Sequence, residues 1–128
     1  MIYLDTSILL AQLLAEDRRP DAALWDQPLV TSRLAEYELW TRLHARGLGR
    51  SHGDTARALL GRVALVELVP PVLARATEPF PLPVRTLDAL HLASAHWLRE
   101  QGQPVIVASY DTRFERAAAA LGFEVAFA

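Results

Sequence analysis

The chain has 128 residues, of which 52% are hydrophobic and 22% charged, with a formal net charge of −2. This length supports one substantial core, and we expect a single domain over residues 1–128. The sequence contains no cysteine, which excludes a disulfide framework, a zinc–thiolate site and a cysteine nucleophile. All 13 basic residues are arginine, and the missing lysine disfavours a Walker-type phosphate loop and a Schiff-base enzyme.

Hydropathy and charge also indicate where the protein is located and what it binds. No apolar run approaches the roughly 20 residues that a membrane span needs, and no basic leader precedes the first apolar stretch. We therefore expect a cytoplasmic protein with no membrane partner. The small negative net charge argues against strong, non-specific binding of nucleic acid by the field of the whole protein.

The first predicted element is a short buried strand. Ile2, Tyr3 and Leu4 run directly into Asp5, and an apolar helical pattern follows to about Ala15. A short apolar run bounded in this way is typical of a parallel strand that is covered on both faces. Asp5 then lies where the strand ends and a helix begins, at the edge where open α/β sheets bind ligands.

The rest of the chain alternates between helical and strand patterns, with proline, serine and glycine at the boundaries. In the first half of the chain we expect a helix over 21–26, a strand over 29–31, a helix capped by Ser32 that ends at 46–47, and a helix from Ser51. A strand over 64–69 follows, which Pro70 and Pro71 break, and then a short helix to about 77 and a proline-rich loop over 78–83. The last part is predicted to hold a helix over 87–100 capped by Thr86, a strand over 105–108, a helix from Asp111 to 121–122 and an edge strand over 124–127. This order predicts an α/β fold, a three-layer α/β/α sandwich with a central, mostly parallel sheet.

Three carboxylates follow from this arrangement. Asp5 and Asp111 each end an apolar strand and begin a helix, so they lie on the same sheet edge, although each could simply be a helix N-cap. Asp88 lies in the first turn of a long helix, where the helix dipole alone favours an acid. Its own helix face carries His91 and Leu92, and a carboxylate on so apolar a face needs a partner or a metal ion.

Glu38 is the fourth candidate, and its mixed helix face leaves an ion pair with Arg42 as the alternative. Four carboxylates at one edge would repel one another unless cations were bound. Mg²⁺ and Mn²⁺ prefer such oxygen ligands, and a metal-bound water is a nucleophile near neutral pH. The pattern indicates metal-assisted hydrolysis of a phosphodiester.

The motifs around these acids resemble those of PIN domains. The match is closest to the VapC type, the ribonuclease toxin of bacterial toxin–antitoxin pairs, and it covers essentially the whole chain. The segments that carry it are Leu4–Ser7, Glu38, Leu87–Ala93 and Ser109–Phe114. The resemblance implies an endoribonuclease that depends on Mg²⁺ or Mn²⁺. It also implies a cognate antitoxin that docks beside the site, and a homodimer.

By this resemblance the metal-binding quartet is Asp5, Glu38, Asp88 and Asp111. We expect the tightest metal contacts from Asp5 and Asp88, with Glu38 as the base that positions water. Thr6 and Ser7 match the hydroxyls that follow the first acid, which cap the first helix and can orient a metal-bound water. Ser109 stands where a threonine is often found, two places before the last acid, and keeps the hydroxyl.

Other polar and aromatic side chains keep two interpretations. Arg113 and Arg116 either contact RNA phosphates or form ion pairs with nearby acids. The stripe of Tyr37, Trp40 and His44 is either ordinary core or a partner surface. His91 is interpreted as a packed helix residue that bonds to the backbone, without a role in the site.

Four other functions compete with this interpretation. A haloacid-dehalogenase-like phosphatase requires a second acid two residues after the first, where Ser7 stands. A receiver-type signalling module requires an acidic pair after the first strand and a lysine after the late one, and this chain has neither. A PIN-domain RNA-processing nuclease without an antitoxin, and a catalytically weak PIN module that binds RNA or protein, share the motifs. The motifs do not encode which RNA is cut.

Overall fold

The computed structural model describes residues 1–126 and contains a parallel sheet with the strand order β3-β2-β1-β4-β5. The strands are β1 Ile2–Leu4, β2 Leu29–Ser32, β3 Ala64–Val66, β4 Ile106–Ala108 and β5 Glu124–Ala126. The helices are α1 Thr6–Leu13, the 3-10 helix η1 Ala22–Asp26, α2 Arg33–Ala45, α3 Gly49–Leu60, α4 Pro70–Ala76, α5 Thr86–Glu100 and α6 Thr112–Ala120. The predicted three-layer α/β sandwich is confirmed.

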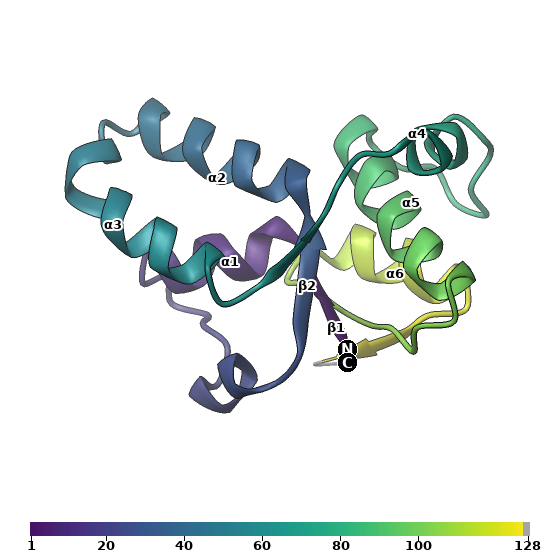
Figure 1. The fold of residues 1–128 in the computed structure, drawn as a ribbon, viewed down its shortest axis with the longest axis horizontal. Coiled ribbons are helices and arrows are strands. Elements are labelled where there is room, and N and C mark those ends of the chain that lie inside the picture. Colours follow the sequence, from purple (N-terminus) through teal and green to yellow (C-terminus); the bar gives the residue numbers. More distant parts are fainter. Residues whose placement is uncertain (127–128) are drawn as a thin grey trace.

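Helices cover both faces of the sheet: α1, α2 and α3 lie on one side, and α4, α5 and α6 lie on the other (Figure 1). The strands alternate between two hydrophobic clusters. Leu4 packs with α1, α2 and α3, whereas its neighbour Tyr3 packs with α5 and α6. Both side chains are fully buried, which explains why the first strand is apolar at every position rather than at every second one.

The strand register brings the polar residues that follow β1 and β4 to one edge of the sheet. In β1, Ile2 is paired with Leu29 of β2 and with Ile106 of β4. At the carboxyl end of this strand, the Asp5 amide donates a hydrogen bond to the Ala108 carbonyl, 3.0 Å away. Because parallel strands end at the same edge, the residues that follow β1 and β4 emerge side by side there.

Several predicted element boundaries are wrong. The first helix ends at Leu13 and not near residue 15, because Ala15 adopts a left-handed conformation with φ of 50°. The predicted strand over 64–69 pairs only over β3. Pro70 and Pro71 then form the first turn of α4, where a missing backbone N–H breaks no helical hydrogen bond.

Two helix starts also differ from the prediction. Helix α3 begins at Gly49, before the predicted Ser51. Helix α5 begins at Thr86 itself, with Arg85 in the N-cap position and no side-chain cap. The predicted last strand is present as β5, and its predicted final residue, Phe127, lies outside the described residues. None of the helices in the described part of the chain is long and apolar enough to cross a bilayer.

Candidate active site

A cavity of about 630 Å³ opens at the carboxyl edge of the sheet. The four predicted acids all line it, together with Arg42 and Arg85 among others. Asp5 follows β1, Asp111 follows β4, Glu38 comes from α2 and Asp88 from the first turn of α5. The structure thus brings acids from both helical layers to one opening.

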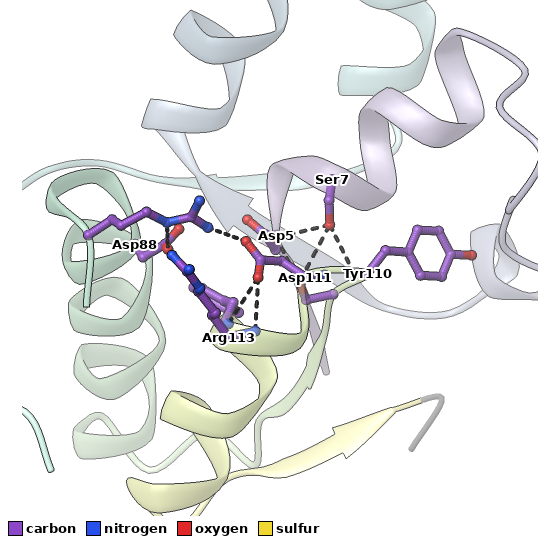
Figure 2. A network of polar contacts seen from close by, with 9 residues as sticks. Asp5, Ser7, Asp88, Tyr110, Asp111 and Arg113 are labelled. Atoms are coloured by element: carbon purple, nitrogen blue, oxygen red, sulfur yellow. Dashed lines mark hydrogen bonds and ion pairs between the residues drawn. The ribbon is translucent and has the colours of Figure 1, made fainter. Parts of the chain in front are cut away.

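Asp5 is held by two serine hydroxyls. Its Oδ2 accepts hydrogen bonds from Ser7 Oγ at 2.9 Å and Ser109 Oγ at 2.7 Å, and its carboxylate is buried. The two hydroxyls accept in turn from the backbone amides of Tyr110 and Asp111, so their protons are available to Asp5 (Figure 2). Asp5 occupies the N-cap position of α1 but its side chain makes no cap hydrogen bond, so capping does not explain why an acid stands there.

Glu38 is held by a hydroxyl and a ring, and the alternative ion pair with Arg42 is not formed. Its Oε1 lies 2.8 Å from Thr6 Oγ1 and 2.6 Å from His91 Nε2. Thr6 and Ser7 therefore hold acids of the site and do not cap the first helix as predicted. The interpretation of His91 as bonded to the backbone is also wrong, because its two ring nitrogens contact side chains.

Tyr3 lies behind this histidine, with its hydroxyl 2.7 Å from His91 Nδ1. Both residues are buried. Burial raises the pKa of Tyr3 well above its ordinary value, with a smaller contribution from the charge of Asp5. The phenol therefore keeps its proton at physiological pH and can donate it to the ring.

Asp88 and Asp111 are bridged by a single guanidinium. Arg85 Nε donates to Asp88 Oδ2 at 2.9 Å, and Arg85 Nη2 donates to Asp111 Oδ2 (Figure 2). Burial raises the pKa of Asp88, Arg85 lowers it, and the charges of Asp5 and Asp111 raise it further. The net direction is upward, chiefly because of burial, and the charges of the two other acids add to it.

Asp111 also caps α6. Its Oδ1 accepts from the backbone amides of Arg113 at 2.9 Å and Phe114 at 3.4 Å. The N-cap interpretation is therefore correct for this acid, and its second oxygen is free of that task. Both carboxylate oxygens of Asp111 have partners within the chain.

The donor set fits a hard divalent cation in kind, because the cavity carries carboxylate and hydroxyl oxygens and no sulfur. Over residues 1–126, however, no three Asp, Glu or His side chains are arranged to hold one ion together. Arg85 bridges two of the four acids. The side chains thus have the oxygen donors that magnesium or manganese prefers, and the positive charge beside Asp88 and Asp111 is that of Arg85.

The remaining candidate residues do not line this cavity. Arg113 lines a small neighbouring cavity with Arg85 and Asp88, whereas Arg116 is exposed on α6 and does not line the acidic cavity. Tyr37 is 63% exposed, so the core interpretation of its stripe is wrong for that residue. Trp40 stacks on His44 with ring centroids 5.8 Å apart.

Sequence reasoning missed Arg85 and underrated His91. The first had a detectable signal, because Arg85 precedes Asp88 by three residues, a spacing that brings side chains together on a helix. The second also had one, since a polar ring on an apolar helix face needs a buried partner. The identity of that partner, Glu38, is not encoded by local spacing.

Comparison with known proteins now decides the family. The family model described as PIN domain matches residues 2–120. The chain belongs to the PIN-domain family. This confirms the resemblance that the acidic motifs carried.

Named relatives match nearly the full length. "Ribonuclease VapC47" of Mycobacterium tuberculosis (strain CDC 1551 / Oshkosh) is 31% identical, over 98% of this chain and 96% of the relative. "Ribonuclease VapC35" of the same strain is 30% identical, over 98% of this chain and 95% of the relative. A solved chain from "Toxin-antitoxin complex from Klebsiella pneumoniae" shares the fold, with a TM-score of 0.68, 19% identity and 94% coverage of each chain.

Proposed function

We propose that this PIN-domain protein is a divalent-metal-dependent endoribonuclease of the VapC type, the toxin of a toxin–antitoxin pair. One observation carries the proposal: four acids from separate elements line one cavity, in a chain whose full-length relatives are named ribonucleases. The proposal includes an RNA substrate, a cognate antitoxin, a homodimer and a cytoplasmic location.

In this proposal Asp5 and Asp88 hold Mg²⁺ or Mn²⁺, with Glu38 and Asp111 completing the site. An ion bound by these residues would supply an activated water and would offset negative charge on the scissile phosphate. Asp5 is already oriented for this task by Ser7 and Ser109. Asp88 and Asp111 become available when Arg85 releases them.

The chain's own residues also position the substrate. Glu38 is fixed through Oε1 and lines the cavity, which suits a base that orients the attacking water. Arg42 and Arg85 lie at the same opening, and Arg113 lies beside it, where each can contact phosphate oxygens. Arg116 is a further candidate on the outer surface of α6.

The test is RNA cleavage by purified protein in the presence of Mg²⁺. Asp5→Asn and Asp88→Asn should each lower the cleavage rate by more than roughly 100-fold, because charged oxygen ligands are lost from the site. Asp54→Asn is the matched control, since Asp54 is exposed on α3, away from the cavity, and pairs with Arg57. Circular dichroism checks that each variant is folded, and the products should carry a 5′ phosphate.

The assignment is wrong if Asp5→Asn and Asp88→Asn cut RNA as fast as the parent. In cells, the parent chain expressed alone should arrest growth, and Asp5→Asn should not. Mapping the ends of RNA recovered from arrested cells would identify the substrate. Co-expression of the cognate antitoxin should restore growth.

A second candidate is a PIN module that binds RNA or protein and cuts weakly. The observation that favours it is the Arg85 bridge, which engages two of the four acids. The cleavage assay separates the two candidates. A weak module would bind RNA equally well with and without Mn²⁺ and would leave it intact.

A further inference from the structure

We propose that His91 is the positioning residue for Glu38, and that Tyr3 fixes the ring tautomer that this task requires. The inference rests on the proposed function, in which Glu38 belongs to the acidic site. It assigns a role to the histidine of the Leu87–Ala93 motif. It also assigns one to a tyrosine in the first strand.

The contact joins residues from four elements. Tyr3 is in β1, Thr6 begins α1, Glu38 is in α2 and His91 is in α5. Helices α2 and α5 lie on opposite sides of the sheet (Figure 1), so the histidine reaches an acid of the other layer past the end of β1. No local helical spacing produces this pair, which makes it a feature of the assembled fold.

Packing fixes the plane of the ring. His91 is 1% exposed. Its ring meets Tyr3 edge to face, with centroids 5.8 Å apart and planes at 78°, and meets Phe114 at 6.2 Å and 85°. A ring confined in this way between two aromatic neighbours cannot turn toward solvent.

The hydrogen bonds then fix the proton. His91 Nε2 lies 2.6 Å from a carboxylate oxygen that already accepts from Thr6 Oγ1, so Nε2 must carry the hydrogen. In the neutral ring Nδ1 is then an acceptor, and the Tyr3 hydroxyl donates to it at 2.7 Å. Removing the Tyr3 hydroxyl leaves a buried acceptor unsatisfied and weakens the support of the ring, although Glu38 still requires a hydrogen on Nε2.

The result is a carboxylate held by one oxygen. Thr6 and His91 both contact Oε1, and within residues 1–126 no hydrogen bond to Oε2 is formed. Glu38 lines the acidic cavity, so its second oxygen remains available to a ligand there. Groups that orient a functional carboxylate are commonly worth about 10- to 100-fold in metal affinity or activity.

Four variants separate positioning from mere packing. His91→Leu removes the donor, and His91→Gln restores an amide N–H near the position of Nε2. Tyr3→Phe removes only the hydroxyl. His96→Leu is the matched control, because His96 lies on the same helix and its nearest acid is Glu100, at 3.6 Å on the surface.

The first readout needs neither metal nor RNA. Imidazole nitrogen NMR of the metal-free protein should show His91 as the Nε2–H tautomer, and Tyr3→Phe should shift or broaden that signal. An Nδ1–H tautomer in the parent would overturn the proposal. So would a spectrum that Tyr3→Phe leaves unchanged.

The second readout is Mn²⁺ binding together with single-turnover RNA cleavage. His91→Leu should weaken both by about 10-fold or more, His91→Gln should recover most of the loss, and His96→Leu should match the parent. Equal losses of Mn²⁺ affinity and cleavage rate in His91→Leu and His91→Gln would show that His91 only fills space and does not position Glu38. If His91→Leu does not fold, Tyr3→Phe decides, and parent-like Mn²⁺ affinity and cleavage in Tyr3→Phe would overturn the role of its hydroxyl.

This outcome is separable from failure of the proposed function. If Asp5→Asn cuts RNA as fast as the parent, the nuclease assignment fails, whatever His91 does. The tautomer and its dependence on Tyr3 are properties of the folded chain alone. They test the positioning contact in either case.

Discussion

The two halves of the acidic cavity are held by different physical means. Asp5 and Glu38 form the inner half, where neutral hydroxyls and a buried ring donate to one oxygen of each carboxylate. Asp88 and Asp111 form the outer half, where the exposed guanidinium of Arg85 bridges them. Neutral donors orient a carboxylate and leave its charge in place, whereas an arginine orients the carboxylate and also neutralises its charge.

This difference makes the inner half preorganised and the outer half adjustable. Buried hydrogen bonds are expensive to break because their partners are then left unsatisfied. The Arg85 side chain is 57% exposed, and ion pairs of exposed side chains contribute little and are screened by salt, so Arg85 can leave more easily than the buried donors of the inner half. A cation that enters the cavity therefore meets two fixed acids and two acids that must first be released.

The largest expected effect follows from breaking the inner half. Ser109 Oγ is buried, donates to Asp5 and accepts from the Asp111 amide. Ser109→Ala leaves that amide without an acceptor, so the free energy of unfolding should fall by about 1–3 kcal/mol. Urea denaturation measures it.

Thr77→Ala is the control for Ser109→Ala. Its exposed hydroxyl donates only to a carbonyl of its own helix, so its loss should change stability far less. Equal losses in the two variants would show that Ser109 contributes no more than a surface hydroxyl. The inner half would then not be the rigid one.

The next effect concerns Asp111, which belongs to both the cavity and the start of α6. Asp111→Ala removes the helix cap and should lower the free energy of unfolding by about 0.5–2 kcal/mol. Asp111→Asn keeps a capping oxygen and loses only the charge that pairs with Arg85, so it should retain most of the stability. Thermal unfolding of the two variants, side by side, measures the cap separately from the ion pair. Equal destabilisation would contradict this division of labour.

A smaller effect is expected from removing the internal cation. Arg85→Gln leaves Asp88 and Asp111 unpaired, so Mn²⁺ should bind severalfold more tightly in calorimetric titrations. Arg33→Gln is the matched control, because Arg33 also bridges two acids, Glu36 and Glu67, away from the cavity. Weaker Mn²⁺ binding by Arg85→Gln would show that Arg85 supports the site and does not compete for it.

The sequence predicts the acids better than it predicts what holds them. The strands β1 and β4 are short apolar runs that end in polar residues, and parallel pairing alone brings Asp5 and Asp111 to one edge. The partners of Glu38 are a different matter. His91 is 53 residues from Glu38 and 88 from Tyr3, so no periodicity connects them.

Element ends are lost for a related reason. A hydrophobic pattern predicts that residues 64–69 suit a strand, but pairing with β2 stops at Val66. The two prolines that follow are compatible with either a break or a helix start, and the structure uses them as the first turn of α4. Where the local sequence is compatible with both a strand and a helix, tertiary contacts determine which of the two forms.

The smallest predicted effect calibrates the outer half against a plain surface pair. A hydrogen bond from Arg33, with a smaller contribution from its charge, lowers the pKa of Glu67 below its ordinary value, and both side chains are exposed. A carboxyl whose folded-state pKa is lowered stabilises the fold above its ordinary value of 4.5, and this stability is lost as the pH falls through the folded-state pKa. Glu67→Gln should therefore lower the melting temperature slightly at pH 7, with the difference from the parent closing toward pH 3. A difference that stays constant across that range would mean that the pair acts through packing, and its loss would then not measure what it costs to break the ion pair of an exposed arginine.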